Sequence, residues 1–254
     1  MATSGQSSGG RRAAIVTGAA SGIGAAIAER FVKDGIDVLS VDLRPGPDTP
    51  GVPFAADLTT REGNNAAVEA AVERFGRLDI IVPNAGFQHV SPIADFDEDR
   101  WDALLAVLLT SPFLLTKYGW PHLVSSGAGR ICVIASAHAL SASPFKSGYV
   151  SGKHGVLGLV KTIALEGADC GVRANAICPG YVRTPLVEAQ IADQAKAHGM
   201  SEDRVVAEVM LSRQPVKQMV ELDDLAEMAV LLTGPHSNSL TGMAVSMDMG
   251  WSAL

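Results

Sequence analysis

The chain is poor in cysteine, and its few cysteines lack the spacing of a metal site. Among 254 residues only Cys132, Cys170 and Cys178 are present, an odd number. Two of them fall in apolar runs typical of strands. Because a buried cysteine behaves as a small apolar side chain, we expect three buried thiols and neither a disulfide nor a metal site.

Long apolar runs and basic tracts are absent as well. No uninterrupted apolar run reaches the roughly 18 residues that a membrane span requires, although 47% of the residues are hydrophobic and the mean hydropathy is +0.21. Nonspecific nucleic-acid binding relies on a basic surface, whereas the net charge is -7 and the pI is near 5.3. We therefore expect a soluble protein that binds neither membranes nor nucleic acid.

The sequence also lacks internal linkers and low-complexity regions. Residues 1–10 are rich in serine and glycine without the apolar segment of a signal peptide, so we expect a flexible tail or a remnant of cloning. Cytoplasm is the expected location. Residues 11–254 are long enough to bury a full core as one domain.

Short apolar runs alternate with helical patterns along this domain. The alternation predicts an α/β fold with one doubly wound parallel sheet. The predicted strands cover residues 13–16, 36–41, 54–57, 78–82, 131–135, 172–178 and 242–248. The predicted helices cover residues 23–35, 61–76, 97–124, 184–198, 201–211 and 222–232, and a further helix begins near residue 147.

Two of these helical segments have special features. Pro112 is expected to bend the helix over residues 97–124 or to break it. Residues 184–198 and 201–211 are expected to lie away from the sheet. They predict a small helical lid, at about residues 184–212, over a cofactor site.

A glycine-rich turn follows the first predicted strand. Gly18, Gly22 and Gly24 allow a backbone to approach a pyrophosphate, and the helix behind them offers free N–H groups. The strand, turn and helix in this order favour a dinucleotide site over a purely structural turn. Asp42 ends the second strand, where a carboxylate accepts hydrogen bonds from ribose hydroxyls and repels a 2′-phosphate, which favours NAD. Arg44 is either a phosphate partner or a solvated loop charge.

Small and polar residues follow the third and fourth predicted strands. Asp57 could contact an adenine edge or cap the helix that begins near Thr60. The fourth strand leads into Asn84, Ala85 and Gly86, which suit a strand end beneath a flat ligand.

A serine, a tyrosine and a lysine predict a proton-transfer site. Tyr149 and Lys153 are four residues apart, which places them on one face of a helix, and Ser136 ends the fifth strand. A free tyrosine has a pKa of about 10, and we expect the nearby ammonium to lower it. Ser136 could bind the reacting oxygen. The alternative is an ordinary core tyrosine, a solvated lysine and a turn-forming serine.

Together these motifs resemble the short-chain dehydrogenase/reductase family over residues 11–254. The resemblance rests on Thr17-Gly18-x3-Gly22-Ile23-Gly24, on Asn84-Ala85-Gly86, and on Ser136 with Tyr149-x3-Lys153. It implies a Rossmann-like, NAD-dependent oxidoreductase with a small-molecule substrate, assembled as a homotetramer. The implied catalytic residues are Ser136, Tyr149 and Lys153. The implied cofactor-binding residues are Gly18, Ser21, Gly22, Ile23, Gly24, Asp42, Asp57, Leu58, Asn84, Ala85, Gly86, Tyr149, Lys153, Pro179, Gly180, Val182 and Thr184.

Three segments are similar to those of bacterial D-3-hydroxybutyrate dehydrogenases, namely NAGFQHVSPI, IASAHALSASPFKSGYVSGKHGV and NAICPGYVRTPLVEAQI. This similarity implies the reversible oxidation of (R)-3-hydroxybutyrate to acetoacetate. A cation and hydrogen-bonding side chains suit a carboxylate, although each is also explained as a loop polar residue, a surface charge or an exposed helix residue. The implied substrate-binding residues are Gln88, Ser136, His138, Lys146, Tyr149 and Gln190.

Three positions depart from the family pattern. Leu108 stands where the family usually has an asparagine of the proton relay, and leucine cannot form a hydrogen bond. Met249 and Gly250 replace a glycine pair, and Tyr181 replaces a frequent tryptophan. The alternatives are therefore a dehydrogenase or ketoreductase for another secondary alcohol or ketone, and a nucleotide-binding homologue with impaired catalysis.

Overall fold

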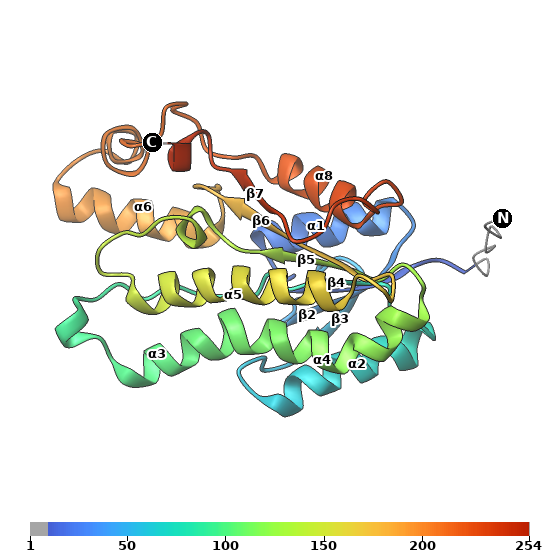
Figure 1. Ribbon diagram of the computed structural model, residues 1–254. Coiled ribbons are helices and arrows are strands. Elements are labelled where there is room, and N and C mark those ends of the chain that lie inside the picture. The colour runs from blue at the N-terminus through green and yellow to red at the C-terminus, as the bar shows by residue number, and fades with distance from the viewer. Residues whose placement is uncertain (1–9, 254) are drawn as a thin grey trace.

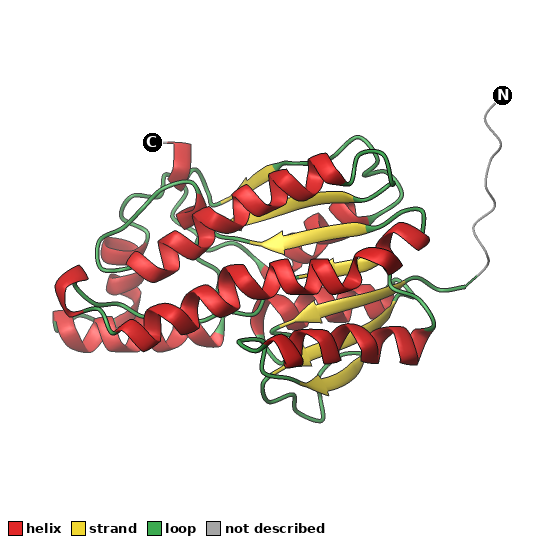
Figure 2. Ribbon diagram, turned by 60° about the horizontal axis from the view of Figure 1, so that its bottom comes forward, coloured by secondary structure: helices red, strands yellow, loops and turns green. Residues whose placement is uncertain are grey.

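The computed structural model describes residues 10–253 of the chain, which form one parallel sheet with helices on both faces (Figures 1 and 2). The strand order is β3-β2-β1-β4-β5-β6-β7, so the chain reverses direction across the sheet between β1 and β4. The predicted doubly wound sheet is confirmed. The strands are β1 (Ala13–Thr17), β2 (Asp37–Asp42), β3 (Val52–Ala55), β4 (Ile80–Val82), β5 (Arg130–Ile134), β6 (Arg173–Pro179) and β7 (Ala244–Met247). Apart from Gly10, the predicted flexible tail lies outside the described residues.

Two layers of helices bury the sheet. Helices α1 and α8 pack together on one face, while α2, α4 and α5 cover the other (Figure 1). Their bounds, with those of the remaining α-helices, are α1 (Gly22–Lys33), α2 (Arg61–Phe75), α3 (Glu98–Leu105), α4 (Ser111–Ser125), α5 (Ser147–Glu166), α6 (Pro185–His198), α7 (Glu202–Arg204) and α8 (Leu222–Thr233).

Strand β1 shows why the central strands are continuously apolar. Ile15 packs into the cluster formed with α2, α4 and α5, whereas Ala14 and Val16 face α1 and α8. Because successive side chains point to opposite faces and both faces are covered, every residue of β1 is buried.

The long predicted helix after β4 is interrupted by a π-helical segment. Helix α3 continues into the π-helical segment Ala106–Thr110 and then into α4. Pro112 lies in the first turn of α4, and since proline has no N–H to donate, the altered turn precedes it. Among the described residues, Glu98–Ser125 is the single helix long and apolar enough to cross a membrane. It packs against α2 and α5 and is a core helix.

Helices α6 and α7 and the π-helical segment Val205–Met210 lie beyond the carboxyl edge of the sheet (Figure 1). They share a small apolar cluster that includes Ile191, Met210 and Tyr181. The two helices predicted over residues 184–198 and 201–211 are therefore present, and their action as a lid stays a prediction.

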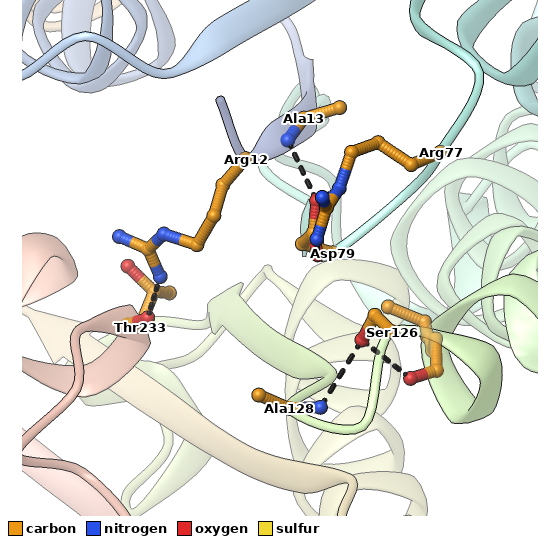
Figure 3. A network of polar contacts seen from close by, with 8 residues as sticks. Arg12, Ala13, Arg77, Asp79, Ser126, Ala128 and Thr233 are labelled. Atoms are coloured by element: carbon orange, nitrogen blue, oxygen red, sulfur yellow. Dashed lines mark hydrogen bonds and ion pairs between the residues drawn. The ribbon is translucent and has the colours of Figure 1, made fainter. Parts of the chain in front are cut away.

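Polar side chains fasten the amino end of the sheet (Figure 3). Asp79, which is 2% exposed, accepts a hydrogen bond from the Ala13 amide at 2.8 Å. Its carboxylate also binds the Arg77 guanidinium at 2.7 and 2.8 Å. Arg12 donates to the Thr233 carbonyl at 2.6 Å. These bonds connect the starts of β1 and β4 to the end of α8.

The three cysteines are free thiols. Cys132 and Cys178 are buried in β5 and β6, where desolvation raises the pKa of Cys132 to about 12 and that of Cys178 to about 11. Cys170 is only partly buried, because it lies in the turn after α5. The expectation of three buried thiols is thus wrong for Cys170.

Candidate active site

The glycine-rich turn and the end of β4 are hydrogen-bonded to each other at the carboxyl edge of the sheet. Asn84 donates its side-chain amide to the Thr17 carbonyl at 2.8 Å, and the Ala85 amide donates to the Thr17 hydroxyl at 3.0 Å. Gly18 has a φ of +64°, and a Cβ atom there would lie 2.9 Å from Ala85 Cα. A Cβ atom at Gly24 would collide with the Gly18 carbonyl oxygen and would lie 2.5 Å from the Asn84 side-chain nitrogen. Side chains are excluded at both glycines because the two motifs pack directly together.

Two adjoining cavities follow this edge and contain most of the predicted cofactor residues. Gly24 and Val182 are buried and line neither of these cavities, and Pro179 and Gly180 line a different cavity described below. The first cavity has among its walls Gly18, Ser21, Gly22, Ile23, Asp42, Asn84, Ala85, Gly86, Tyr149, Lys153 and Thr184. The second has among its walls Gly18, Asp42, Asp57, Leu58, Ala85 and Gly86.

Asp42 lies at the end of β2 and contacts both cavities. One carboxylate oxygen accepts a hydrogen bond from the Ala20 amide at 3.1 Å, and the other accepts from the Arg44 amide at 3.2 Å. Arg44 therefore meets this carboxylate through its backbone. The carboxylate is fixed beside the glycine turn, where the sequence predicts ribose binding.

Asp57 does not cap α2. Its carboxylate accepts hydrogen bonds from the amide and hydroxyl of Thr59 at 2.9 and 2.7 Å, and these bonds lower its pKa. The capping hydroxyl belongs to Thr60, which accepts from the Gly63 amide. That half of the prediction is wrong, while Asp57 does reach the cavity wall.

The predicted catalytic residues come together beside the end of β5. Tyr149 and Lys153 lie on one face of α5, with the Lys153 nitrogen 5.7 Å from the centre of the Tyr149 ring. Lys153 is 6% exposed and donates to the Ile134 carbonyl at 2.7 Å. The Ser136 hydroxyl accepts from the His138 amide at 3.1 Å.

Burial dominates the electrostatics of this pair. Desolvation raises the pKa of Tyr149, and the Ser136 side chain acts in the opposite direction. The expectation that Lys153 lowers the pKa below that of a free tyrosine is therefore wrong for the protein alone. Desolvation also lowers the pKa of Lys153 to about 8. The Tyr149 phenolate and the Lys153 ammonium are both disfavoured, because the two side chains lie in one poorly hydrated site.

A cavity of about 100 Å³ adjoins Tyr149 and contains all six predicted substrate-binding residues. Val187, Gln214 and Trp251 also line it and were not predicted. They come from the segments after β6 and β7, so no local motif connects them with Tyr149. The complete lining is Gln88, Ser136, Ala137, His138, Lys146, Tyr149, Pro179, Gly180, Tyr181, Val187, Gln190, Gln214 and Trp251.

The hydrogen bonds at the cavity wall leave several donors free. Gln190 of α6 donates its side-chain amide to the Gln88 side-chain oxygen at 2.9 Å, which joins α6 to the segment after β4. No carboxylate of the described residues lies within ion-pair distance of Lys146. Burial alone lowers the pKa of Lys146. The lysine is a partly buried cation that lacks an acidic partner among the side chains that the structure describes.

Gln214, which also lines the cavity, has a hydrogen-bond acceptor without a donor among the described residues. The residue is 1% exposed, and its side-chain amide donates to the carbonyl oxygens of Val216, at 2.8 Å, and of Gln218. These two carbonyls fix the orientation of the amide. The other side-chain atom, Oε1, is buried and has no hydrogen-bond partner in the described part of the chain.

The departures from the family pattern have clear structural consequences. Leu108 is 2% exposed and packs so closely that a Cβ atom at Gly86 or Gly152 would lie 2.7 or 2.9 Å from its side chain. An apolar wall therefore stands beside Tyr149 and Lys153. Met249 adopts a φ of +56°, a left-handed conformation that favours glycine.

Comparisons with known proteins agree with this geometry. The family model for short chain dehydrogenases matches residues 12–195. A D-beta-hydroxybutyrate dehydrogenase of Rhizobium meliloti is 43% identical, over 95% of this chain and 99% of the relative. One of Cupriavidus necator is 38% identical, over 95% and 98%.

A solved structure shares the fold as well. The ligand-free aldohexose dehydrogenase of Thermoplasma acidophilum superposes with a TM-score of 0.90 at 28% identity, over 96% of this chain and 95% of that chain. The resemblance inferred from the ordered motifs is confirmed over nearly the whole length. The chain belongs to the short-chain dehydrogenase family.

Proposed function

We propose that the protein is an NAD-dependent dehydrogenase that interconverts (R)-3-hydroxybutyrate and acetoacetate. The observation that supports this most is the small cavity beside Tyr149, in which Lys146 lacks an acidic partner among the described residues. A partly buried cation with neighbouring amide donors suits a carboxylate. A cavity of about 100 Å³ suits a short-chain acid.

Tyr149, Ser136 and Lys153 would perform the proton chemistry. Tyr149, as the phenolate, takes the proton of the substrate hydroxyl, and Ser136 orients the reacting oxygen. Lys153 supplies a positive charge near the tyrosine ring and favours the phenolate. A bound nicotinamide would supply the redox chemistry as a hydride acceptor. These three residues, together with the hydrogen-bonding side chains of the cavity, would hold the substrate in one orientation.

The residues at the carboxyl edge fit a dinucleotide. The close-packed turn at Gly18 presents backbone amides in front of α1, which suits a pyrophosphate. The Asp42 carboxylate stands at the wall of both cofactor cavities, where a 2′-phosphate would be repelled. Arg44 contacts the same carboxylate through its backbone amide.

Initial rates test the proposal directly. NAD and NADP reduction would be measured with (R)-3-hydroxybutyrate, with its S enantiomer and with butan-2-ol. We expect rapid NAD reduction with the R acid alone. Faster turnover of the neutral alcohol would contradict the carboxylate site, and a preference for NADP would contradict the role of Asp42.

A second candidate is a dehydrogenase for a hydroxy acid that carries a further hydrogen-bond donor. The buried Oε1 atom of Gln214 favours it, because the methyl group of 3-hydroxybutyrate cannot donate to an amide oxygen. Rates with (R)-3,4-dihydroxybutyrate distinguish the two. A higher kcat/KM for the dihydroxy acid than for 3-hydroxybutyrate would favour this second function.

We also propose that the protein is a cytoplasmic homotetramer. Phe113 on α4 and Leu165 on α5 are exposed apolar side chains, the latter 79% exposed. Exposed apolar residues on packed helices favour contacts between subunits. Sedimentation equilibrium would measure the mass, and a monomer at micromolar concentration would contradict the assembly.

A further inference from the structure

One contact in the substrate cavity orients a histidine through a residue that does not line the cavity itself. His138 follows the end of β5, and Ser143 lies in the loop that leads to Lys146 and α5. The two side chains meet with Nε2 of His138 2.9 Å from Oγ of Ser143. The imidazole ring is further confined by the Tyr149 ring, at 6.0 Å between centres, and by the Trp251 ring, at 5.4 Å.

The surroundings of His138 keep its imidazole neutral. Burial, together with the positive charges of Lys146, His154 and Arg213, lowers the pKa of His138 to about 4. A neutral imidazole has one N–H donor and one acceptor nitrogen. Which nitrogen carries the proton is decided by the hydrogen bond that the other nitrogen makes.

The contact with Ser143 leaves Nδ1 as the free nitrogen of the ring. Nδ1 forms no hydrogen bond with any described residue, and it is not among their buried unpaired atoms. If Nε2 carried the proton, Nδ1 would be an acceptor, and a carboxylate beside it would be repelled. If Ser143 donates to Nε2, Nδ1 carries the proton and becomes a donor.

We propose that Ser143 is a positioning residue that donates its hydroxyl proton to Nε2 of His138 and thereby presents Nδ1–H to the substrate carboxylate. A hydroxyl suits this task because it can donate or accept, whereas a backbone carbonyl would force the proton onto Nε2. Ser143 Oγ has no other partner in the described part of the chain, so its proton is available. The inference rests on the proposed hydroxy-acid substrate.

Kinetics of matched variants provide the first test. We expect Ser143→Ala to raise the KM for (R)-3-hydroxybutyrate about tenfold, roughly one hydrogen bond to a charged group, with little change in kcat. Ser143→Thr keeps the hydroxyl and should restore the KM. Ser141→Ala is the control, because Ser141 lies in the same loop and its side chain has no hydrogen bond to any described residue. An unchanged KM in Ser143→Ala, or an equal rise in the control, would overturn the inference.

The nitrogen-15 NMR shifts of the His138 ring provide a second test, independent of turnover. The wild-type protein is expected to show the Nδ1–H tautomer, and Ser143→Ala a mixture of both tautomers. A wild-type ring protonated on Nε2 would refute the role of Ser143. If the wild-type protein shows Nδ1–H but does not oxidise 3-hydroxybutyrate, the proposed function fails while the tautomer assignment stands. If Ser143→Ala does not fold, the wild-type spectrum and the Ser143→Thr variant still test whether Ser143 sets the tautomer of His138.

Discussion

The two edges of the sheet use buried polar residues in opposite ways. At the amino edge, Asp79 accepts bonds from Ala13 and Arg77, and the chain itself completes this group (Figure 3). At the carboxyl edge, Lys146 lacks an acidic partner and Gln214 Oε1 lacks a donor among the described residues. Both edges hold buried or partly buried polar side chains, and the difference lies in whether the protein completes their bonds.

This difference has an energetic meaning. A buried polar group without a partner costs about 1–3 kcal/mol of stability, so folded proteins pair nearly all of them. An unpaired group beside a cavity marks a place where a ligand can supply the missing bond. The amino edge is therefore expected to govern stability, and the carboxyl edge to govern binding and turnover.

The largest expected effect comes from removing one oxygen at the carboxyl edge. Tyr149→Phe is expected to lower kcat roughly 100-fold to 10,000-fold, because it removes the general base. NADH binding, measured by fluorescence, and the free energy of unfolding should change little. Retained turnover would show that Tyr149 is not the base.

The second effect concerns the unpaired cation. Lys146→Ala should raise the KM for a carboxylate substrate roughly 10-fold to 100-fold, since a hydrogen bond to a charged group contributes about 1.5–3 kcal/mol. The KM for a neutral secondary alcohol should hardly change, and steady-state kinetics with both substrates measure the contrast. Lys117→Ala, on α4 away from the cavity, is the control. Equal losses with both substrates would contradict an anion site.

The amino edge is tested by Asp79→Asn. The variant loses the ion pair with Arg77, and we expect the free energy of unfolding to fall by about 2 kcal/mol. KM and kcat at temperatures below the unfolding transition should stay unchanged. Urea denaturation measures the loss, and the exposed pair of Arg30 with Asp34 provides the control, for which Asp34→Asn should cost less than about 1 kcal/mol. A KM change in Asp79→Asn would break the contrast between the edges.

The pH dependence of the oxidation follows from the raised pKa of Tyr149. Only the phenolate accepts a proton, and burial moves its formation above the usual pKa of about 10. Between pH 7 and 8, where Lys153 with its pKa of about 8 still carries most of its charge, the rate of hydroxy-acid oxidation should therefore rise, by at most about tenfold per pH unit. Initial rates at saturating NAD and substrate measure it. A rate that is independent of pH in this range would argue against a phenolate base.

The smallest expected effect is a gain. Leu108→Asn restores the side chain that the family usually has in its proton relay, and we expect kcat to rise several-fold. The amide enters the apolar cluster of Leu104 and Val107, so the free energy of unfolding should fall by about 1–3 kcal/mol. Stopped-flow and steady-state rates compare the variant with Leu108→Met. No gain over wild type would show that the relay does not pass this position.

Local patterns predicted the strands, the glycine turn and the pairing of Tyr149 with Lys153. Each depends on residues close in sequence, where helix and strand periods fix the geometry. The resemblance to a family of dehydrogenases grouped Gln88, His138 and Gln190 as substrate-binding residues. The structure places all three at one cavity. The roles of these residues stay predictions.

The features that the sequence did not predict depend on distant contacts. Gln214 and Trp251 reach the cavity from segments that have no motif in common with Tyr149. The pKa of Tyr149 was predicted in the wrong direction because helical spacing reveals a neighbouring ammonium but not the depth of burial. The prediction that Asp57 could cap α2 was wrong, because its carboxylate binds Thr59 and the Thr60 hydroxyl caps the helix.

The hydrogen bond between Gln190 and Gln88 joins two amides before any ligand binds. Gln190 uses one of its two N–H groups in this bond, and Gln88 uses only its side-chain oxygen. Each residue therefore keeps N–H groups without a partner in the described part of the chain. Under the proposed function, a substrate carboxylate would bind these donors without breaking the bond. Because the bond already restricts both side chains, little conformational entropy would be lost when the carboxylate binds.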